Sequence, residues 1–111
     1  MIDTETFREI ALSFPGTEEK PHFERAAFKV IKRRIFATLH EASETANIVL
    51  SIDDQQVFCT FGKDAVYPVP NKFGLHGWTT FNLKKVSREL VSDALYTAYK
   101  EVFKTKRKNK G

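Results

Sequence analysis

The sequence predicts an α+β domain, in which an antiparallel β-sheet is flanked by an N-terminal and a C-terminal helix. Three observations support this fold class. Apolar residues recur at helical spacing near both ends of the chain, and short alternating segments occupy its centre. Between them, residues 26–40 (AAFKVIKRRIFATLH) have the pattern of two strands joined by a basic turn. We expect this hairpin at the centre of the sheet and predict the element order α-β-β-β-α-β-α.

The first predicted helix covers residues 3–14, where one apolar stripe is formed by Phe7, Ile10, Ala11 and Phe14. Asp3 or Thr4 can cap its N-terminus, and Pro15-Gly16 ends it.

Residues 17–25 are predicted to form a loop or a short edge strand, because Pro21 cannot serve in a central strand. In the hairpin that follows, Ala26, Phe28 and Val30 share one face of the first strand. A four-residue turn through Ile31–Arg34 fits best, since no glycine is present for a tighter turn.

Residues 46–52 (ANIVLSI) predict a third strand, and Asp53 is the expected cap of a short helix over 54–61. Residues 63–77 contain two prolines and two glycines and are predicted to be mostly irregular. The segment 78–83 predicts the last strand, and Ser87 caps the final predicted helix, 88–104.

Size and composition limit the class of protein. The 111 residues suit one domain, which we place at 1–104, followed by a basic tail at 105–111. Cys59 is the sole cysteine, so neither a disulfide nor a cysteine-based metal site is expected. No apolar run is long enough to cross a membrane, and no signal-peptide pattern opens the chain. We therefore expect a cytoplasmic protein.

The net charge of +4 comes from the end of the chain. Residues 100–111 contain six basic residues and one acidic residue, whereas residues 1–99 contain 12 basic and 13 acidic residues. The body of the domain is therefore close to neutral, which weakens the case for a phosphate-binding surface over the whole domain.

No motif indicates an enzyme, a metal site or a cofactor. His22, His40 and His76 lack the local spacings of metal ligands, and nucleotide-binding and hydrolase motifs are absent. Residues 74–77 (GLHG) match the GxxG pattern of some RNA-binding loops but lead into a strand, not a helix. Their glycines are expected to permit positive φ angles or close packing beside Trp78.

Several ordered segments resemble the MmcQ/YjbR-like family: 11–19 (ALSFPGTEE), 20–23 (KPHF), 27–30 (AFKV), 35–39 (IFATL), 67–70 (YPVP) and 77–79 (GWT). The set runs over nearly the whole chain in the family's order. Members often carry glycine in the hairpin turn, where this chain has Lys32-Arg33. The resemblance implies a CyaY-like, "double wing" α+β fold and a DNA-binding role, and it transfers no catalytic residue.

The leading functional hypothesis is a monomeric, non-enzymatic domain that binds DNA weakly through phosphates. The expected contacts come from the hairpin turn, the long loop and the tail: Lys32, Arg33, Arg34, Lys72, Lys106, Arg107 and Lys108. Such contacts position a duplex but give little sequence preference.

The alternative is a module that binds a protein or a small molecule in a cleft under residues 63–78. It requires four side chains to converge on one concave pocket: His22, Tyr67, His76 and Trp78. An enzyme is the third possibility, and it would need His22 or His76 beside a carboxylate in a cleft.

Overall fold

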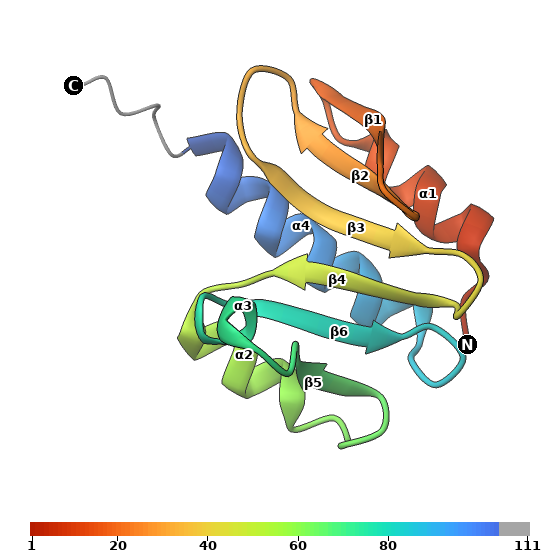
Figure 1. Cartoon of the computed structure of the whole chain (residues 1–111), viewed down its shortest axis with the longest axis vertical. Helices are drawn as coiled ribbons and strands as arrows, with labels where there is room; N and C mark the ends of the chain where they lie inside the picture. Colours follow the sequence, from red (N-terminus) through yellow and green to blue (C-terminus); the bar gives the residue numbers. More distant parts are fainter. Residues whose placement is uncertain (105–111) are drawn as a thin grey trace.

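The computed structural model describes residues 1–104 and confirms the predicted fold class (Figure 1). Its helices are α1 (Thr4–Ser13), α2 (Ile52–Cys59), α3 (Lys72–Leu75) and α4 (Arg88–Lys104). Its strands are β1 (Thr17–His22), β2 (Arg25–Val30), β3 (Ile35–His40), β4 (Thr45–Val49), β5 (Val66–Pro68) and β6 (Trp78–Asn82). Within this described part, no helix combines the length and the apolar character needed to cross a bilayer.

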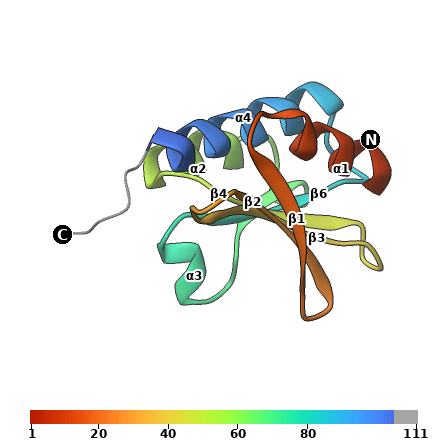
Figure 2. The ribbon, with the colours of Figure 1, turned by 90° about the horizontal axis from the view of Figure 1, so that it is seen from above.

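The strands form one antiparallel sheet in the order β1-β2-β3-β4-β6-β5. Figure 2 shows α1, α2 and α4 on one side of this sheet and α3 on the other. We call the side that carries α1 and α4 the helix face and the opposite side the open face. This one-sided arrangement leaves much of the open face without a packed layer.

The predicted hairpin is present, with β2 and β3 joined through the turn 31–34. Lys32 has a φ of 66°, in the left-handed region that glycine tolerates best. The turn therefore has a lysine at a position where glycine is the least strained residue. The lysine carries a left-handed backbone strain on the order of 1 kcal/mol.

The sheet has two strands more than the four firmly predicted. Residues 17–22 form β1, so the edge-strand alternative for 17–25 is the correct one, and Pro21 is tolerated because one side of an edge strand needs no partner. The segment 63–77 was predicted as mostly irregular, but it contains β5 and the single turn of α3.

Two predicted boundaries around α2 are wrong. The third strand ends at Val49, not at residue 52, because Ile52 already belongs to the helix. Ser51, not Asp53, is the N-cap: its hydroxyl accepts a hydrogen bond from the Asp54 amide at 3.0 Å. Asp53 lies in the first turn, where its negative charge still suits the helix dipole.

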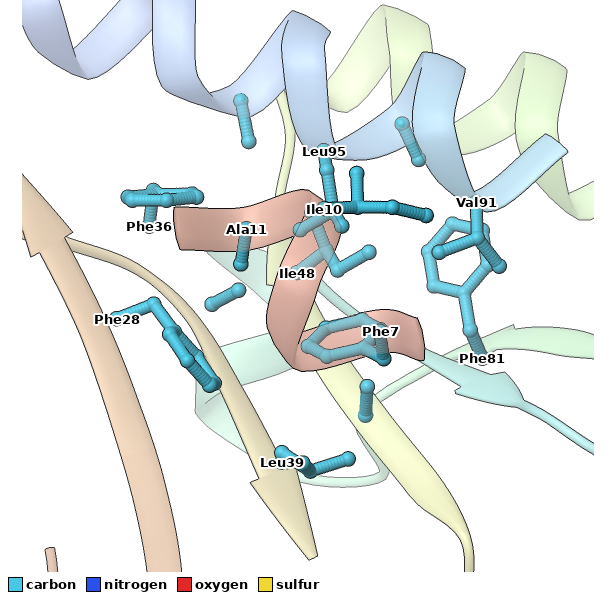
Figure 3. Packing of buried hydrophobic residues seen from close by; sticks show 14 of the residues in the cluster. Phe7, Ile10, Ala11, Phe28, Phe36, Leu39, Ile48, Phe81, Val91 and Leu95 are labelled. Carbon is cyan, nitrogen blue, oxygen red and sulfur yellow. The ribbon is translucent and has the colours of Figure 1, made fainter. Parts of the chain in front are cut away.

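The hydrophobic core fills the space between the helix face and the helices above it (Figure 3). Phe7 of α1 meets Phe28 of β2 edge-to-face, with ring centroids 5.9 Å apart. At the end of α1, Phe14 stacks on Tyr99 of α4 at 4.8 Å, and the Tyr99 hydroxyl donates to the Pro15 carbonyl at 2.7 Å. Aromatic packing therefore joins both terminal helices to the same sheet face.

A β-bulge in β3 increases this apolar packing. The β2–β3 register shifts between Phe28 and Lys29, so that Phe36 has no partner across the pair. Phe36 and Ala37, although adjacent in sequence, are both fully buried in the core. Beyond the bulge, Ile35 pairs with Lys29, and both side chains belong to the open face.

The segment between β5 and β6 is held by two close backbone approaches. A Cβ atom added to Gly77, which has a φ of 98°, would lie 1.8 Å from the Leu50 carbonyl oxygen. One added to Gly74 would lie 2.0 Å from the Val69 carbonyl oxygen. Only glycine permits these contacts, so the two glycines fix the course of residues 69–77 beside β4 and β6.

The substitution Gly77→Ala should therefore destabilise the fold strongly. It combines left-handed strain with a backbone clash, and we expect the free energy of unfolding to fall by about 3 kcal/mol. Gly16→Ala is the matched control, because Gly16 has a φ of 74° but no heavy atom within 4 Å of its added Cβ. Its cost should be only about 1 kcal/mol. Urea unfolding at 25 °C measures both values, and equal costs would disprove the tight approach at Leu50.

Candidate functional site

The floor of the candidate site is a row of residues that crosses the open face in register. Ala27 of β2 pairs with Thr38 of β3, Thr38 with Asn47 of β4, Asn47 with Thr80 of β6, and Thr80 with Tyr67 of β5. The Thr80 hydroxyl donates to Asn47 Oδ1 at 2.7 Å. The middle of this sheet face is thus polar and hydrogen-bonded, although the strands are buried on their other side.

A hollow of about 300 Å³ lies on this floor. Its lining comes from five strands and the loop that contains α3: His22, Arg25, Ile35, Thr38, Asn47, Val69, Asn71, Phe73 and Trp78. We call it the open-face pocket. In Figure 2, the β1–β2 hairpin and α3 both project beyond the sheet on this side. Both contribute residues to the lining of the pocket.

Gln55 of α2 holds the loop side of the pocket in place. This side chain is buried, and its Nε2 amide lies 3.1 Å from the Gly74 carbonyl oxygen, 3.2 Å from that of Trp78 and 3.1 Å from Thr79 Oγ1. A single amide group therefore ties α2 to α3 and to the start of β6. Because Trp78 lines the pocket, Gln55 positions one of its aromatic walls from the opposite side of the sheet.

The hairpin side of the pocket carries its charge. His22 and Arg25 are the paired residues that close the β1–β2 hairpin. Arg25 Nε donates to the Thr38 hydroxyl at 2.8 Å, while Nη2 is buried and has no hydrogen-bond partner in the part of the chain that the structure describes. Burial without a compensating anion lowers the pKa of Arg25.

The tip of the same hairpin is strained. Phe23 has a φ of 60°, and its side chain is 96% exposed. It follows His22, and the two rings meet edge-to-face with centroids 5.1 Å apart. A bulky residue with positive φ is uncommon, and such strain is found most often near functional sites.

A larger hollow, about 650 Å³, lies beside α1 and the hairpin and shares Arg25 with the open-face pocket. Three of its other charged residues, Arg8, Glu19 and Glu41, are joined by ion pairs. Arg8 forms ion pairs with Glu5 at 3.1 Å, Glu19 at 3.0 Å and Glu41 at 2.7 Å. The hydrogen bonds that Arg8 donates to Glu19 and Glu41 raise the pKa of Arg8. These ion pairs connect α1 to β1 and to the β3–β4 turn, so they have a structural role.

The structure brings together two of the four residues predicted for the alternative site. His22 and Trp78 both line the open-face pocket. Tyr67 belongs to the same sheet face but stands on the edge strand β5, outside the lining. His76 is exposed at the C-terminal end of α3 and is also outside it.

The predicted DNA contacts are distributed around the molecule. Lys32 and Arg34 are exposed in the β2–β3 turn, and Lys72 is exposed at the start of α3. The Arg33 guanidinium carbon lies 5.4 Å from the centroid of the Phe103 ring, so this side chain is directed toward α4. Lys106, Arg107 and Lys108 lie outside the described residues.

The sequence reasoning missed most of the pocket lining. Period-two alternation marks Thr38, Asn47 and Thr80 as residues of one strand face, a signal that was available. It does not show which strands are neighbours, and β4 pairs with β6 although α2, β5 and α3 lie between them in the chain. In residues 1–104, no group of three or more His, Cys, Asp or Glu side chains is arranged to hold a metal ion.

Comparison with known proteins gives the family. The YjbR family model matches residues 12–101, which is most of the chain. The chain belongs to the YjbR family. A crystal structure similar to this YjbR protein is that of DR2400 from Deinococcus radiodurans, which has a DUF419 domain. The TM-score is 0.83 at 20% sequence identity, over 98% of this chain and 84% of the other, so the likeness shows the fold. No curated protein matches the chain.

The Gln55→Glu variant tests how the loop of this YjbR protein is held. A carboxylate facing two carbonyl oxygens and a hydroxyl cannot donate unless it is protonated, so its folded-state pKa should rise above the unfolded value of about 4.3. Stability should then fall as the pH rises through the folded pKa, by about 2–4 kcal/mol relative to wild type at pH 7. Below the unfolded-state pKa, the stability difference between the variant and wild type should become smaller.

Thermal unfolding from pH 3.5 to 7.5 measures this difference. Gln55→Met is the control, because it removes the donor without adding a charge and should lose stability equally at every pH. A pH-independent loss in Gln55→Glu would show that the amide does not bond to the loop.

Proposed function

We propose that this YjbR domain is a binding module that holds a small ligand in the open-face pocket. The observation that carries the proposal is the convergence on one hollow of apolar walls and a few polar groups from separate elements. Trp78, Phe73 and Val69 supply the apolar side, and Arg25 and Asn47 supply polar groups. This composition is typical of small-molecule sites, and a volume of about 300 Å³ is at the lower end of their range.

A binding role is favoured over catalysis by the surroundings of the histidines. A histidine that takes part in acid–base or nucleophilic catalysis lies within hydrogen-bond reach of a carboxylate or a nucleophile. His22 contacts the Phe23 ring, and within residues 1–104 neither His22 nor His76 has a hydrogen bond or an ion pair to a carboxylate. His40 Nδ1 lies 2.7 Å from the Ser43 hydroxyl, but both residues are outside the pocket lining. The proposal therefore assigns binding, not chemistry, to the pocket.

A fragment screen by two-dimensional ¹H–¹⁵N NMR tests the pocket. Bound fragments should shift the amide signals of Arg25, Thr38 and Asn47 and the Trp78 indole N–H signal, which is unique because the chain has one tryptophan. Ile35→Phe fills the hollow and should weaken binding at least roughly tenfold.

Ile31→Phe is the matched control for this screen. It makes the same chemical change at an exposed position in the β2–β3 turn, outside the pocket lining, and should leave binding unchanged. Fragments that bind Ile35→Phe as well as wild type, or that shift only signals elsewhere, would contradict the proposed site.

Weak DNA binding is the second candidate, and cations beside the pocket favour it. Arg34 directly precedes the pocket residue Ile35, and Lys72 directly precedes Phe73. Lys29 pairs with Ile35 on the open face. These cations come from both sides of the pocket, but residues 1–104 hold 14 basic and 14 acidic residues, so any phosphate contact would be local.

Fluorescence anisotropy with a labelled duplex at several salt concentrations tests this candidate. The double variant Arg34→Gln/Lys72→Gln should make the slope of log K against log salt shallower by about 1.8, the value for two lost phosphate contacts. Lys63→Gln/Lys84→Gln removes equal charge and should leave the slope unchanged. If only Lys106→Gln/Arg107→Gln/Lys108→Gln reduces the slope, the folded domain makes no phosphate contact.

A further inference from the structure

We infer that the ligand of the open-face pocket is a planar organic monocarboxylate, held by Arg25 and Asn47 against Trp78 and Phe73. This inference rests on the proposed function and specifies the chemical class of the ligand.

The charge of the lining selects an anion. Of the nine lining residues, Arg25 is the only one that is always charged, and none is Asp or Glu. By contrast, Arg8 on the helix face is surrounded by three carboxylates. Arg25 also borders the larger hollow with Glu19, Glu24 and Glu41, but within residues 1–104 it forms no ion pair with them. A guanidinium without a paired carboxylate attracts an anion, and one fixed positive charge matches one negative charge.

The donors of Arg25 are nearly all unused. A guanidinium has five N–H donors, and in residues 1–104 only the one at Nε has a protein acceptor, the Thr38 hydroxyl. That bond orients the fork, and the Nη groups keep their hydrogens. A buried donor without an acceptor costs about 1–3 kcal/mol. A carboxylate that accepts from the Nη groups, after a small shift of the side chains covering Nη2, removes this cost.

Asn47 supplies a second donor on the floor. Its Oδ1 already accepts from the Thr80 hydroxyl at 2.7 Å, which orients the amide and leaves the Nδ2 hydrogens as donors. The structure gives Nδ2 no acceptor within residues 1–104. Thr38 stands between Asn47 and Arg25, since it pairs with Asn47 and accepts from Arg25. The polar floor therefore presents donors from β2 and β4, the two strands that flank β3.

The remaining walls suit a flat apolar group. Trp78 and Phe73 contribute aromatic rings, and Ile35 and Val69 contribute aliphatic side chains. Aromatic walls bind planar rings through stacked or edge-to-face contacts. A volume of about 300 Å³ limits the ligand to a small ring system with its acid group.

A phosphate ester fits this lining less well than a carboxylate. A phosphate carries up to two negative charges and three acceptor oxygens, and protein sites meet them with several cations or a run of backbone amides. Arg25 is the one permanent cation in the lining, and a carboxylate has the two-oxygen geometry that a guanidinium binds best.

The test is an NMR titration of the full chain with three probes that share a phenyl ring: trans-cinnamate, its neutral analogue trans-cinnamamide, and phenyl phosphate. The Trp78 indole N–H signal reports binding. We expect cinnamate to bind about tenfold to a hundredfold more tightly than the amide, the range for a charge-assisted hydrogen bond. Phenyl phosphate should bind more weakly than cinnamate.

Variants assign this preference to Arg25. Arg25→Gln should reduce the carboxylate-over-amide ratio to about one, and Arg25→Lys should retain part of it, because the charge remains without the two-donor fork. Arg34→Gln makes the same change at an exposed position outside the lining and should keep the full ratio. Thermal unfolding verifies that each variant is folded. If Arg25→Gln does not fold, the loss of preference is measured in Arg25→Lys instead.

The outcomes separate this inference from the function on which it rests. If the amide binds as tightly as cinnamate, or if the preference survives in Arg25→Gln, the carboxylate assignment is wrong while the pocket remains a binding site. Tighter binding of phenyl phosphate would also overturn it. If no probe shifts the Trp78 signal, the ligand class is wrong, and the fragment screen with Ile35→Phe decides separately whether the pocket binds at all.

Discussion

The packing of both terminal helices on one face of the sheet is the interaction on which the rest of the structure depends. Phe7 of α1 and Leu95 of α4 are fully buried against strand residues that all point the same way. Burial of this apolar surface is the main driving force for folding. Because the helix face buries this apolar surface, the opposite face of the same strands can carry polar residues. Thr38, Asn47 and Thr80 lie there.

The open face becomes a pocket because the chain extends beyond the sheet on both sides. The β1–β2 hairpin supplies His22 and Arg25, and the loop with α3 supplies Phe73. Both extensions include backbone that most residues avoid. Phe23 has a positive φ at the hairpin tip, and Gly77 has a positive φ and touches the Leu50 carbonyl where the loop returns to β6. The local cost of these conformations is offset by the cooperative packing of the core.

Two arginines illustrate how position decides what a charge can do. Arg8 lies among three glutamates, and its interactions link α1 to the sheet. Arg25 has only uncharged neighbours in the lining of the open-face pocket, and it donates to one hydroxyl. It also borders the larger hollow with Glu19, Glu24 and Glu41, but the described residues show no ion pair between Arg25 and these carboxylates. The ion pairs of Arg8 leave few N–H donors for a ligand. Arg25 keeps a guanidinium with unused donors at the wall of the pocket. The family assignment and the fold alone do not distinguish these two roles.

The sequence by itself determined the fold class, the two terminal helices and the β2–β3 hairpin, although not its place in the sheet, whose middle pair is β3 and β4. Local signals were sufficient, since the stripe of α1, its Asp3 cap and the strands around the 31–34 turn depend on residues close in the chain. It also placed His22 and Trp78 in one proposed site. Only the tertiary structure decided that Thr38, Asn47 and Arg25 share a floor and that Tyr67 and His76 stand apart. Strand neighbours and close backbone approaches are long-range properties, and no local pattern specifies them.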